Sequence, residues 1–367
     1  MKPKLLCILH RSPPAHGAAK VGDFIGESKK LKENFDCRFI TIKSSDTIGD
    51  IGKVNIKKLY LVVELFIKVL FTLLVFRPQK LYFTSSISGV AFYRDLLVSL
   101  LWKSYKFFKP LEVYHHYHTK GIDSFVSRSN KNLKLTNFFI KDVNMMLLSP
   151  LLETDLQMVD SYKRIIFLPN GVEDSFKNED INSYLEKKYS KVDKIQALYL
   201  AHMMKEKGYW DVLELALKTK NQNIHYHFAG SWKDEENKKN FFDFIKIHNL
   251  EKDVTYHGFV TGDQKKELFK KAHILLYPSK NDAFPLTLLE SLSFGVPVIA
   301  SNEGSISYIL DEECGVIISN FLNSFESTLQ LSITKFINKK SSEYCRKKFI
   351  QNFSLEQFEK NLIKALK

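Results

Sequence analysis

A chain of 367 residues with 44% hydrophobic and 26% charged residues is long enough for two domains with separate cores, and this composition is that of a globular protein and not of a disordered one. The 54 Lys and Arg residues against 41 Asp and Glu residues give a formal charge of +13. This excess indicates an anionic partner such as nucleotide phosphate, nucleic acid or a membrane surface, and a lysine-rich solvated surface is the alternative.

The four cysteines are scattered and form no C-x-x-C pair, which indicates a reduced, cytosolic protein without a zinc knuckle or a disulfide framework. The apolar run Leu5 to Leu9 is too short for a signal-peptide core. A longer apolar stretch, Leu59 to Phe76, contains Glu64 and Lys68 at helical i,i+4 spacing. Since each charge would cost roughly 2.5–3.5 kcal/mol at the centre of a bilayer, we expect a helix packed on a sheet, with peripheral membrane contact left open.

The first half of the chain alternates short apolar runs with helical periods. Strands are predicted at residues 4–9, 38–43, 80–84, 111–117, 145–148 and 165–168, and helices at 19–33, 59–76 and 90–107. This alternation predicts a doubly wound parallel sheet.

Two strand ends in this half carry groups suited to a ligand. Gly17, followed by two alanines, would let backbone approach a ligand closely, although an ordinary βα turn is the alternative. The loop has no G-x-G-x-x-G, so a dinucleotide fingerprint is not supported. His116 and His118 share one face of an extended segment, and they fit either a polar site lining or a structural role, because no third zinc ligand follows at a suitable spacing.

The alternation restarts after the turn Pro169-Asn-Gly-Val172. Strands are predicted at residues 197–200, 225–229, 254–256, 274–277, 296–300 and 315–318, and helices at 209–218, 264–271, 286–294 and 358–366. Two sheets of similar size, divided near residues 165–175, fit this pattern.

The stretch Tyr277 to Ser301 reads as a strand, a loop, a helix and a second strand, which is one βαβ unit. Pro285 suits the first helical turn, where its missing N–H is no loss. Asp282 lies in the loop, where ligands of parallel sheets bind, although a helix cap is its alternative role. Glu290 lies on a largely apolar helix, so a carboxylate there needs partners, and a solvated helix residue is the alternative.

Three motifs in chain order resemble the retaining glycosyltransferases of family 4. The strongest is Asp282-x7-Glu290 followed by Phe294-Gly-Val-Pro-Val, where the family usually has Glu-x7-Glu and a Gly-x-Pro-Val strand. The segment Lys205-Glu-Lys-Gly208 is similar to the family's Arg-x4-Lys-Gly segment, and Pro169-Asn-Gly-Val172 is similar to the opening of its C-terminal domain.

The resemblance covers essentially the whole chain and implies an α/β protein of the GT-B fold, with two Rossmann-like doubly wound domains facing a central cleft. The domains it implies are an acceptor-side domain at residues 1–168 and a nucleotide-sugar domain at 169–345. Residues 346–367 are expected to form a helical segment that returns toward the N-terminal domain.

The implied activity is a hexosyltransferase-type reaction that moves a sugar, with retention, from a nucleoside-diphosphate donor to a glycan or polyprenyl-linked acceptor. Surface polysaccharide synthesis, such as that of O-antigen or capsule, is the implied pathway. No cofactor and no metal are expected, in agreement with the lack of a D-x-D motif. The implied location is the cytoplasm, with peripheral contact at an anionic inner membrane face left open.

The resemblance also implies the roles of individual residues. Its catalytic residues would be Asp282, Lys207 and His118, and its donor-binding residues would be Gly17, His202, Lys207, Phe284, Pro285, Leu286 and Glu290. Lys207 would neutralise the diphosphate beside the amides of the helix that starts near Pro285, while Glu290 would accept from ribose hydroxyls and Asp282 from the transferred sugar.

Two positions depart from the family pattern: His202 stands where Arg is usual, and Asp282 stands where Glu is usual. A histidine carries full charge only below about pH 6.5, so His202 is expected to act as a donor and Lys207 as the main cation.

Two other functions remain open from the sequence. A nucleotide-sugar 2-epimerase of the same fold would convert free nucleotide sugars without an acceptor. A basic nucleic-acid-binding protein would bind oligonucleotides with a steep salt dependence and would leave Asp282 and Glu290 without a purpose.

Overall fold

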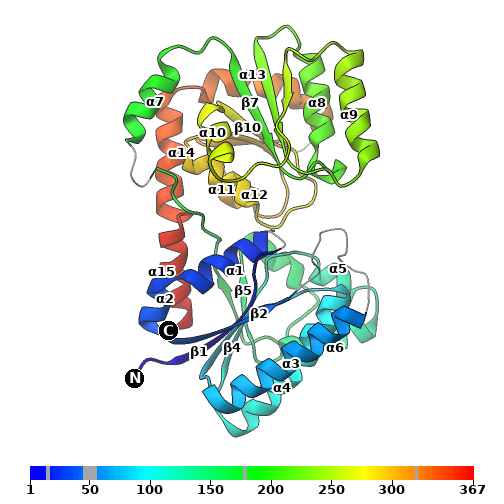
Figure 1. Ribbon diagram of the computed structural model, residues 1–367, viewed down its shortest axis with the longest axis vertical. Helices are drawn as coiled ribbons and strands as arrows, with labels where there is room; N and C mark the ends of the chain where they lie inside the picture. Colours follow the sequence, from blue (N-terminus) through cyan, green and yellow to red (C-terminus); the bar gives the residue numbers. More distant parts are fainter. Residues whose placement is uncertain (14–16, 44–55, 177–179, 319–320) are drawn as a thin grey trace. The chain divides into compact units, whose positions relative to one another are not determined.

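The structure, a computed structural model, describes residues 1–13, 17–43, 56–176, 180–318 and 321–367. It divides into two compact units, one formed by Met1–Asn170 with Leu355–Lys367 and the other by Gly171–Ser354 (Figure 1). The C-terminal segment that belongs with the first unit therefore begins at Leu355 and not at residue 346 as expected, because the preceding helix packs in the second unit.

The first unit has a six-stranded parallel sheet in the order β2-β1-β3-β4-β5-β6. Its strands are β1 (Lys4–His10), β2 (Asp36–Ile42), β3 (Lys80–Thr84), β4 (Glu112–His116), β5 (Asn144–Leu147) and β6 (Arg164–Phe167). Its helices are α1 (Gly17–Glu27), α2 (Lys29–Asn34), α3 (Ile56–Phe76), α4 (Gly89–Phe108), α5 (Ile122–Val126), α6 (Asn130–Ile140), the 3-10 helix η2 (Pro150–Leu156) and α15 (Leu355–Leu366).

The helix predicted at residues 19–33 is two helices. Ser28 separates them, because its side chain accepts a hydrogen bond from the Leu31 amide at 3.0 Å and so caps α2. Helices α5 and α6 were not predicted. Helix α5 is a single short turn, and α6 has too few apolar residues to show a clear helical period. Helix α15 packs beside α2, where Lys30 pairs with Glu356 at 2.9 Å.

Helix α3 packs on the sheet by one face only. Its residues Leu65, Val69, Leu73 and Phe76 join the core of the first unit, and most of its other apolar side chains are exposed. Lys68 pairs with Glu64 at 2.5 Å, as their i,i+4 spacing suggested. By length and composition alone, residues 59–76 could cross a membrane, although only 17% of this segment is buried.

The second unit has a six-stranded parallel sheet in the order β12-β11-β10-β7-β8-β9. Its strands are β7 (Ile195–Leu200), β8 (Ile224–Ala229), β9 (Val254–Tyr256), β10 (Ile274–Tyr277), β11 (Val298–Ser301) and β12 (Gly315–Ile318). Its helices are α7 (Ile181–Ser190), the 3-10 helix η3 (Lys205–Lys207), α8 (Tyr209–Lys218), α9 (Glu235–Ile247), α10 (Gly262–Lys271), α11 (Leu286–Ser293), α12 (Ile306–Ile309), α13 (Phe321–Phe336) and α14 (Lys339–Asn352).

Helices cover both faces of this sheet, as the apolar strands require. Helices α8, α9 and α13 contribute to an apolar core with β7, β8 and β10 on one face. Helices α10, α11 and α14 pack on the other face, where α11 contacts α14 (Figure 1). Helices α9, α13 and α14 were not predicted, because their many Lys, Glu and Asn residues obscure the apolar period.

Arg346 on α14 ties three parts of the second unit together. Its guanidinium pairs with both oxygens of Asp174 at 2.7 and 3.0 Å and donates to the carbonyl of Ser293, at the end of α11, at 2.6 Å. The side chain is 8% exposed, and its guanidinium carbon lies 5.5 and 5.6 Å from the ring centroids of Phe176 and Phe349. Because this cation is buried with its partners, its contacts hold the α11–α14 pair in place.

We expect Arg346→Met to lower the free energy of unfolding by about 3 kcal/mol, because it leaves Asp174 without its cation in a partly buried position. Lys339→Met, which removes the exposed pair with Glu186, is the matched control and should leave stability unchanged. Urea unfolding of both variants makes the comparison, and equal midpoints would contradict this role of Arg346.

His115 in β4 is a histidine buried in the core of the first unit. Its ring is fully buried, 4.6 Å from the ring centroid of Phe139, and burial followed by the nearby Lys103 lowers its pKa to about 3. The unfolded chain binds a proton near pH 6.5 and the folded chain does not, so stability is complete above pH 6.5 and falls as the pH drops toward 3.

We therefore expect His115→Phe to flatten the pH dependence of unfolding. The wild-type protein should lose about 2 kcal/mol more than the variant between pH 6.5 and pH 5, measured by denaturant titrations at each pH. Tyr117→Phe is the control, because it removes the 3.3 Å contact between the Tyr117 hydroxyl and His115 but keeps the imidazole. Parallel pH profiles for wild type and His115→Phe would refute the assignment.

Candidate active site in the second unit

The candidate site is built where neighbouring parallel strands of the second sheet end. Strands β7, β10 and β11 are adjacent, so the loops that follow them leave the same edge of the sheet. The first loop leads to η3 and Lys207, the second contains Asp282, and the third contains Glu303 and Gly304. Crevices outside this carboxyl edge are where open α/β sheets bind ligands.

Lys207 and Asp282 form an ion pair across two of these loops. The Lys207 Nζ lies 2.6 Å from Asp282 Oδ2 and also donates to the Asn281 carbonyl at 2.6 Å. Both side chains are about one-fifth exposed, at 19% each, so the pair is sheltered but reachable from solvent. These contacts account for two of the three N–H donors of the ammonium group.

The turn that carries Lys207 is fixed by hydrogen bonds and close packing. The Tyr199 hydroxyl donates to the carbonyls of His202 and Lys207 at 3.1 and 3.3 Å. Gly208 has φ +77°, and a Cβ there would lie 2.5 Å from the Pro278 carbonyl oxygen. Only glycine therefore lets this turn approach the loop after β10 so closely.

Asp282 is held by groups that the sequence analysis did not single out. The buried Tyr277 hydroxyl donates to Asp282 Oδ2 at 2.7 Å, and the Asp282 amide lies 3.4 Å from Glu303 Oε1. Burial, followed by the charge of Asp282, raises the pKa of Tyr277, so the phenol remains a donor. Glu303 and Gly304 lie just after a predicted strand, and this position could have identified them as candidate site residues from the sequence.

His202 lies in the loop after β7 and contacts Ser231, not the ion pair. Its Nδ1 is 2.8 Å from Ser231 Oγ. Burial and then the nearby Lys207 charge lower the pKa of this imidazole, so His202 is neutral near pH 7. A neutral ring agrees with the expectation that His202 is a hydrogen-bond donor and that Lys207 is the main cation.

Glu290 has a protein partner that the sequence did not reveal. It forms an ion pair with Lys265 of α10, and the two side chains are 13% and 23% exposed. The carboxylate on this largely apolar helix therefore has a partner within the protein, as its position requires, and Lys265 balances its charge. Sequence reasoning missed this contact because Lys265 lies 25 positions earlier on another helix.

Helix α11 begins without a side-chain cap. Pro285 is its N-cap residue and makes no capping hydrogen bond, and the first turn contains no acidic residue. The Phe284 side chain is buried, with Tyr308 and Phe353 as ring neighbours, while Leu286 is half-buried. Any contribution of Phe284 to ligand binding would therefore come from its backbone, and the positive end of the helix dipole would favour an anion here.

The remaining candidates lie at the carboxyl edge of the first sheet. Gly17 is the first residue of α1, is exposed, and has nothing within 4 Å of where a Cβ would be. His118 follows β4, and its ring centroid is 4.1 Å from that of His116. His116 is buried and contacts the Tyr82 hydroxyl at 2.5 Å, and burial holds its pKa well below the usual range.

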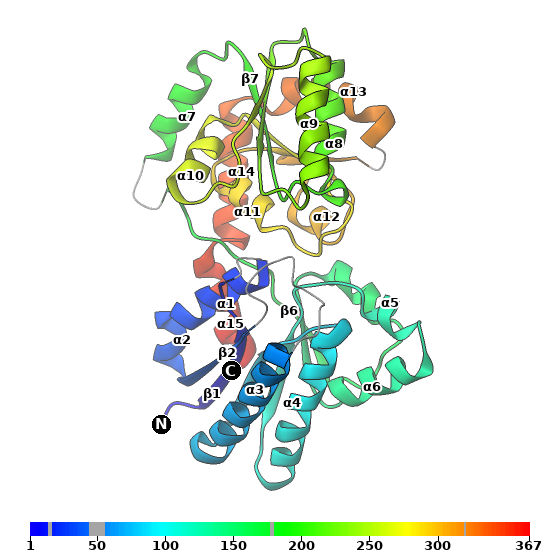
Figure 2. The ribbon, with the colours of Figure 1, turned by 45° about the vertical axis from the view of Figure 1, so that its right-hand side comes forward.

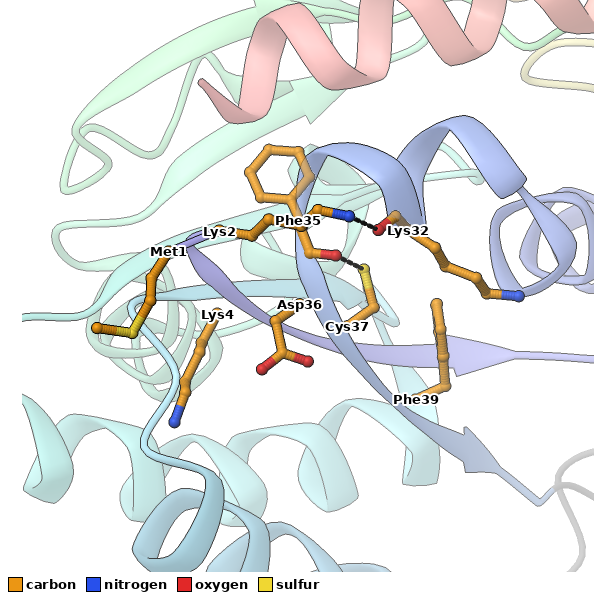
Figure 3. Close-up of a pocket in the computed structure, with 8 residues that line it drawn as sticks. All are labelled: Met1, Lys2, Lys4, Lys32, Phe35, Asp36, Cys37 and Phe39. Atoms are coloured by element: carbon orange, nitrogen blue, oxygen red, sulfur yellow. Dashed lines mark hydrogen bonds between the residues drawn. The ribbon is translucent and has the colours of Figure 1, made fainter.

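A recess is present at the opposite, amino edge of this sheet. Its lining consists of Met1, Lys2, Lys4, Lys32, Phe35, Asp36, Cys37 and Phe39 (Figure 3). None of the candidate residues lines it. Among the residues that the structure describes, no group of three or more His, Cys, Asp or Glu side chains could hold a metal ion.

We expect Gly304→Ala to disturb the Asp282 loop. Gly304 has φ +54°, and a Cβ there would lie 2.1 Å from the Asp282 carbonyl oxygen. Gly262, with φ +53° and open space around it, is a matched control, because Gly262→Ala adds the backbone strain without the clash. Chemical unfolding should show Gly304→Ala to be less stable than Gly262→Ala by about 1–3 kcal/mol, and equal losses would contradict the close approach.

Most of the second unit matches a known protein family. Residues 180–352 match the family Glycosyl transferases group 1. The O-antigen biosynthesis glycosyltransferase WclY of Escherichia coli is 30% identical over 156 residues, which are 41% of this chain and 41% of WclY. The chain thus spans about two fifths of the length of the curated relatives that it matches first.

Solved structures resemble the chain over its full length. Sucrose-phosphate synthase from Thermosynechococcus elongatus has a TM-score of 0.72 at 14% identity and covers 100% of this chain and 98% of its own. HepE of Anabaena in complex with UDP and glucose has a TM-score of 0.69 at 13% identity, with 99% of each chain covered. At such identities the likeness establishes the fold alone. The chain therefore has the GT-B fold, and its residues 180–352 match the glycosyl transferases group 1 family.

Proposed function

We propose that this protein is a glycosyltransferase that moves a sugar from a nucleoside-diphosphate donor to a glycan or polyprenyl-linked acceptor. The observation that carries the proposal is the Lys207–Asp282 pair, which combines a sheltered cation and a carboxylate at the carboxyl edge of the second sheet. The group 1 domain contains both residues, and the O-antigen relative supports a role in surface polysaccharide synthesis. Capsule synthesis is a second pathway of the same chemistry.

The diphosphate of the donor is proposed to bind between Lys207 and the start of α11. A leaving diphosphate gains negative charge as the glycosidic bond breaks, and a fixed cation stabilises that charge most strongly in a sheltered site. His202 Nδ1 is proposed to accept from the Ser231 hydroxyl, 2.8 Å away. In that tautomer the Nε2 of the neutral ring carries the proton and can donate to a phosphate oxygen. The backbone amides at Phe284 and Leu286, around Pro285, would supply further donors.

The two carboxylates are proposed to hold the sugars. Glu290 would accept hydrogen bonds from the ribose hydroxyls while the ion pair with Lys265 orients its carboxylate. Asp282, oriented by Tyr277, would accept from a hydroxyl of the transferred sugar. In the first unit, His118 and the backbone at Gly17 are proposed to contact a sugar. The nucleotide in the HepE structure, UDP, makes a uridine donor the first one to test.

The reaction is proposed to retain the anomeric configuration without a metal ion or a cofactor. The acceptor hydroxyl would attack from the face that the diphosphate leaves, and a phosphate oxygen would take its proton. No covalent nucleophile is needed, and a product of inverted configuration would contradict this route. The proposed location is the cytoplasm, at the inner face of the cell membrane, where a polyprenyl-linked acceptor is available.

We expect Lys207→Met to lower acceptor-dependent sugar transfer about 100-fold or more, since it removes the cation aimed at the leaving group. Lys280→Met is the matched control, because Lys280 lies two residues before Asp282 but is 62% exposed and pairs with Asp211. Transfer from labelled nucleotide sugars to a lipid-linked acceptor, with calorimetric UDP binding in parallel, separates the loss of binding from the loss of turnover.

The control should stay within about twofold of wild type, and full activity of Lys207→Met in a folded protein would refute the role of Lys207. Conversion of a free nucleotide sugar without any acceptor would instead identify a 2-epimerase. Tight oligonucleotide binding with a steep salt dependence would favour the nucleic-acid alternative.

A further inference from the structure

Helix α3 presents an apolar face to solvent over its whole described length. The exposed large apolar side chains of this face are Leu59, Tyr60, Val63, Ile67, Leu70, Phe71, Leu74 and Val75. They recur at intervals of three and four residues, so they cover roughly half of the helix circumference. The opposite side carries Leu65, Val69 and Leu73, which are buried in the core of the first unit.

Helix α4 extends this surface. It lies beside α3, and Phe92, Val98 and Trp102 bury its inner face in the same core (Figures 1 and 2). Because both helices cover the same side of the sheet, their outer faces point away from that side together. The exposed large apolar residues of α4 are Val90, Tyr93, Leu97, Leu100, Phe107 and Phe108. We call these side chains of α3 and α4 together the α3–α4 face.

The α3–α4 face is too apolar for an ordinary solvated surface. The 18-residue segment 59–76 has a mean hydropathy of 2.4, yet only 17% of it is buried. A core helix of that composition would be mostly buried, and soluble monomers rarely expose apolar patches that continue across two helices. The face therefore needs an apolar partner.

Charges around the face indicate which partner fits. Between residues 59 and 109 the chain has seven basic residues, at positions 68, 77, 80, 94, 103, 106 and 109, and two acidic residues, Glu64 and Asp95. Arg94 pairs with the buried Asp95, Lys68 and Lys43 pair with Glu64, and Lys80 pairs with Glu112. The positive charge beyond these pairs comes from residues 77, 103, 106 and 109. Near the C-terminal end of α3, the Lys4 ammonium and the Arg38 guanidinium lie 5.3 and 5.6 Å from the Phe76 ring centroid.

We infer that the α3–α4 face docks on an anionic lipid surface, with α3 lying in the plane of the membrane interface. Leucine and aromatic side chains on a helix flanked by Lys and Arg suit the boundary between headgroups and acyl chains. The helix does not span the bilayer, because Leu65, Val69 and Leu73 remain in the core and Glu64 and Lys68 lie midway along it. This inference rests on the first unit and is independent of the proposed transfer reaction.

The test measures flotation of the purified full-length protein with vesicles. We expect binding to vesicles of phosphatidylcholine with phosphatidylglycerol, and at least severalfold weaker binding to phosphatidylcholine alone or at high salt. Phe71→Glu with Leu74→Glu replaces two side chains that are 66% and 60% exposed, and should lower the bound fraction about tenfold or more.

The matched control is Ile247→Glu with Leu331→Glu, on α9 and α13, where the side chains are 72% and 74% exposed. It removes similar apolar groups and adds the same charge, so it should bind vesicles as wild type does. Phe107→Glu with Phe108→Glu, at the exposed end of α4, provides a second variant of the α3–α4 face that should also lose binding. Circular dichroism and unfolding midpoints check that each protein is folded.

Three results would overturn the inference. Wild-type protein that stays with the aqueous fraction would exclude the lipid surface. Light scattering that shows a dimer, dissociated by Phe71→Glu with Leu74→Glu and indifferent to vesicles, would assign the face to a second copy of this chain. Retention in vesicles after an alkaline carbonate wash would indicate a spanning helix.

Transfer to a water-soluble acceptor should be unchanged in the Phe71→Glu, Leu74→Glu variant, so failure of docking and failure of the proposed reaction are distinguishable.

Discussion

The ion pair between Lys207 and Asp282 depends on how closely three loops approach one another at the carboxyl edge of the second sheet. Parallel pairing of β7, β10 and β11 makes the loops neighbours, and two glycines then allow their backbones to touch. Gly208 packs against Pro278 and Gly304 packs against Asp282, in places where a Cβ would overlap a carbonyl oxygen. A cation and a carboxylate that are 75 positions apart in sequence are thereby held at hydrogen-bond distance.

The charge distribution of this edge follows from burial. His202 and Tyr277 are kept neutral, the first by desolvation and the Lys207 charge and the second by desolvation and the Asp282 charge. Lys207 is therefore the cation beside these two neutral donors, and Glu290 is balanced separately by Lys265. This edge therefore combines one sheltered cation with two carboxylates that are each held by a contact within the protein.

The first unit applies the same layer architecture differently. Its sheet is also covered on both faces, but α3 and α4 bury only their inner sides and leave apolar outer sides in solvent. A doubly wound sheet needs only one apolar stripe from each helix. The additional apolar residues of α3 do not contribute to this core, and an interaction outside the unit explains them better than the fold does.

Local patterning was sufficient to predict the fold class, because strict alternation of apolar runs and helical periods leaves a parallel layered sheet as the arrangement that buries them. Each of the twelve strands that the structure describes lies where a strand was predicted, although the strand predicted at 111–117 is shorter. Helices α5, α6, α9, α13 and α14 were missed. Glycine and proline positions also predicted that Lys207, Asp282 and Pro285 follow the ends of strands. Such predictions are possible because the pattern involves only a few neighbouring residues.

Which of these residues contact one another depends on the tertiary arrangement. It paired Glu290 with Lys265, placed Tyr277 and Glu303 on Asp282, and turned His202 toward Ser231. It also decided that most of the apolar surface of α3 faces solvent, although its composition alone suggested a packed helix. The reason is physical: residue spacing fixes the face of a helix or strand on which a side chain lies, whereas its partner depends on strand order and on backbone approaches between distant segments.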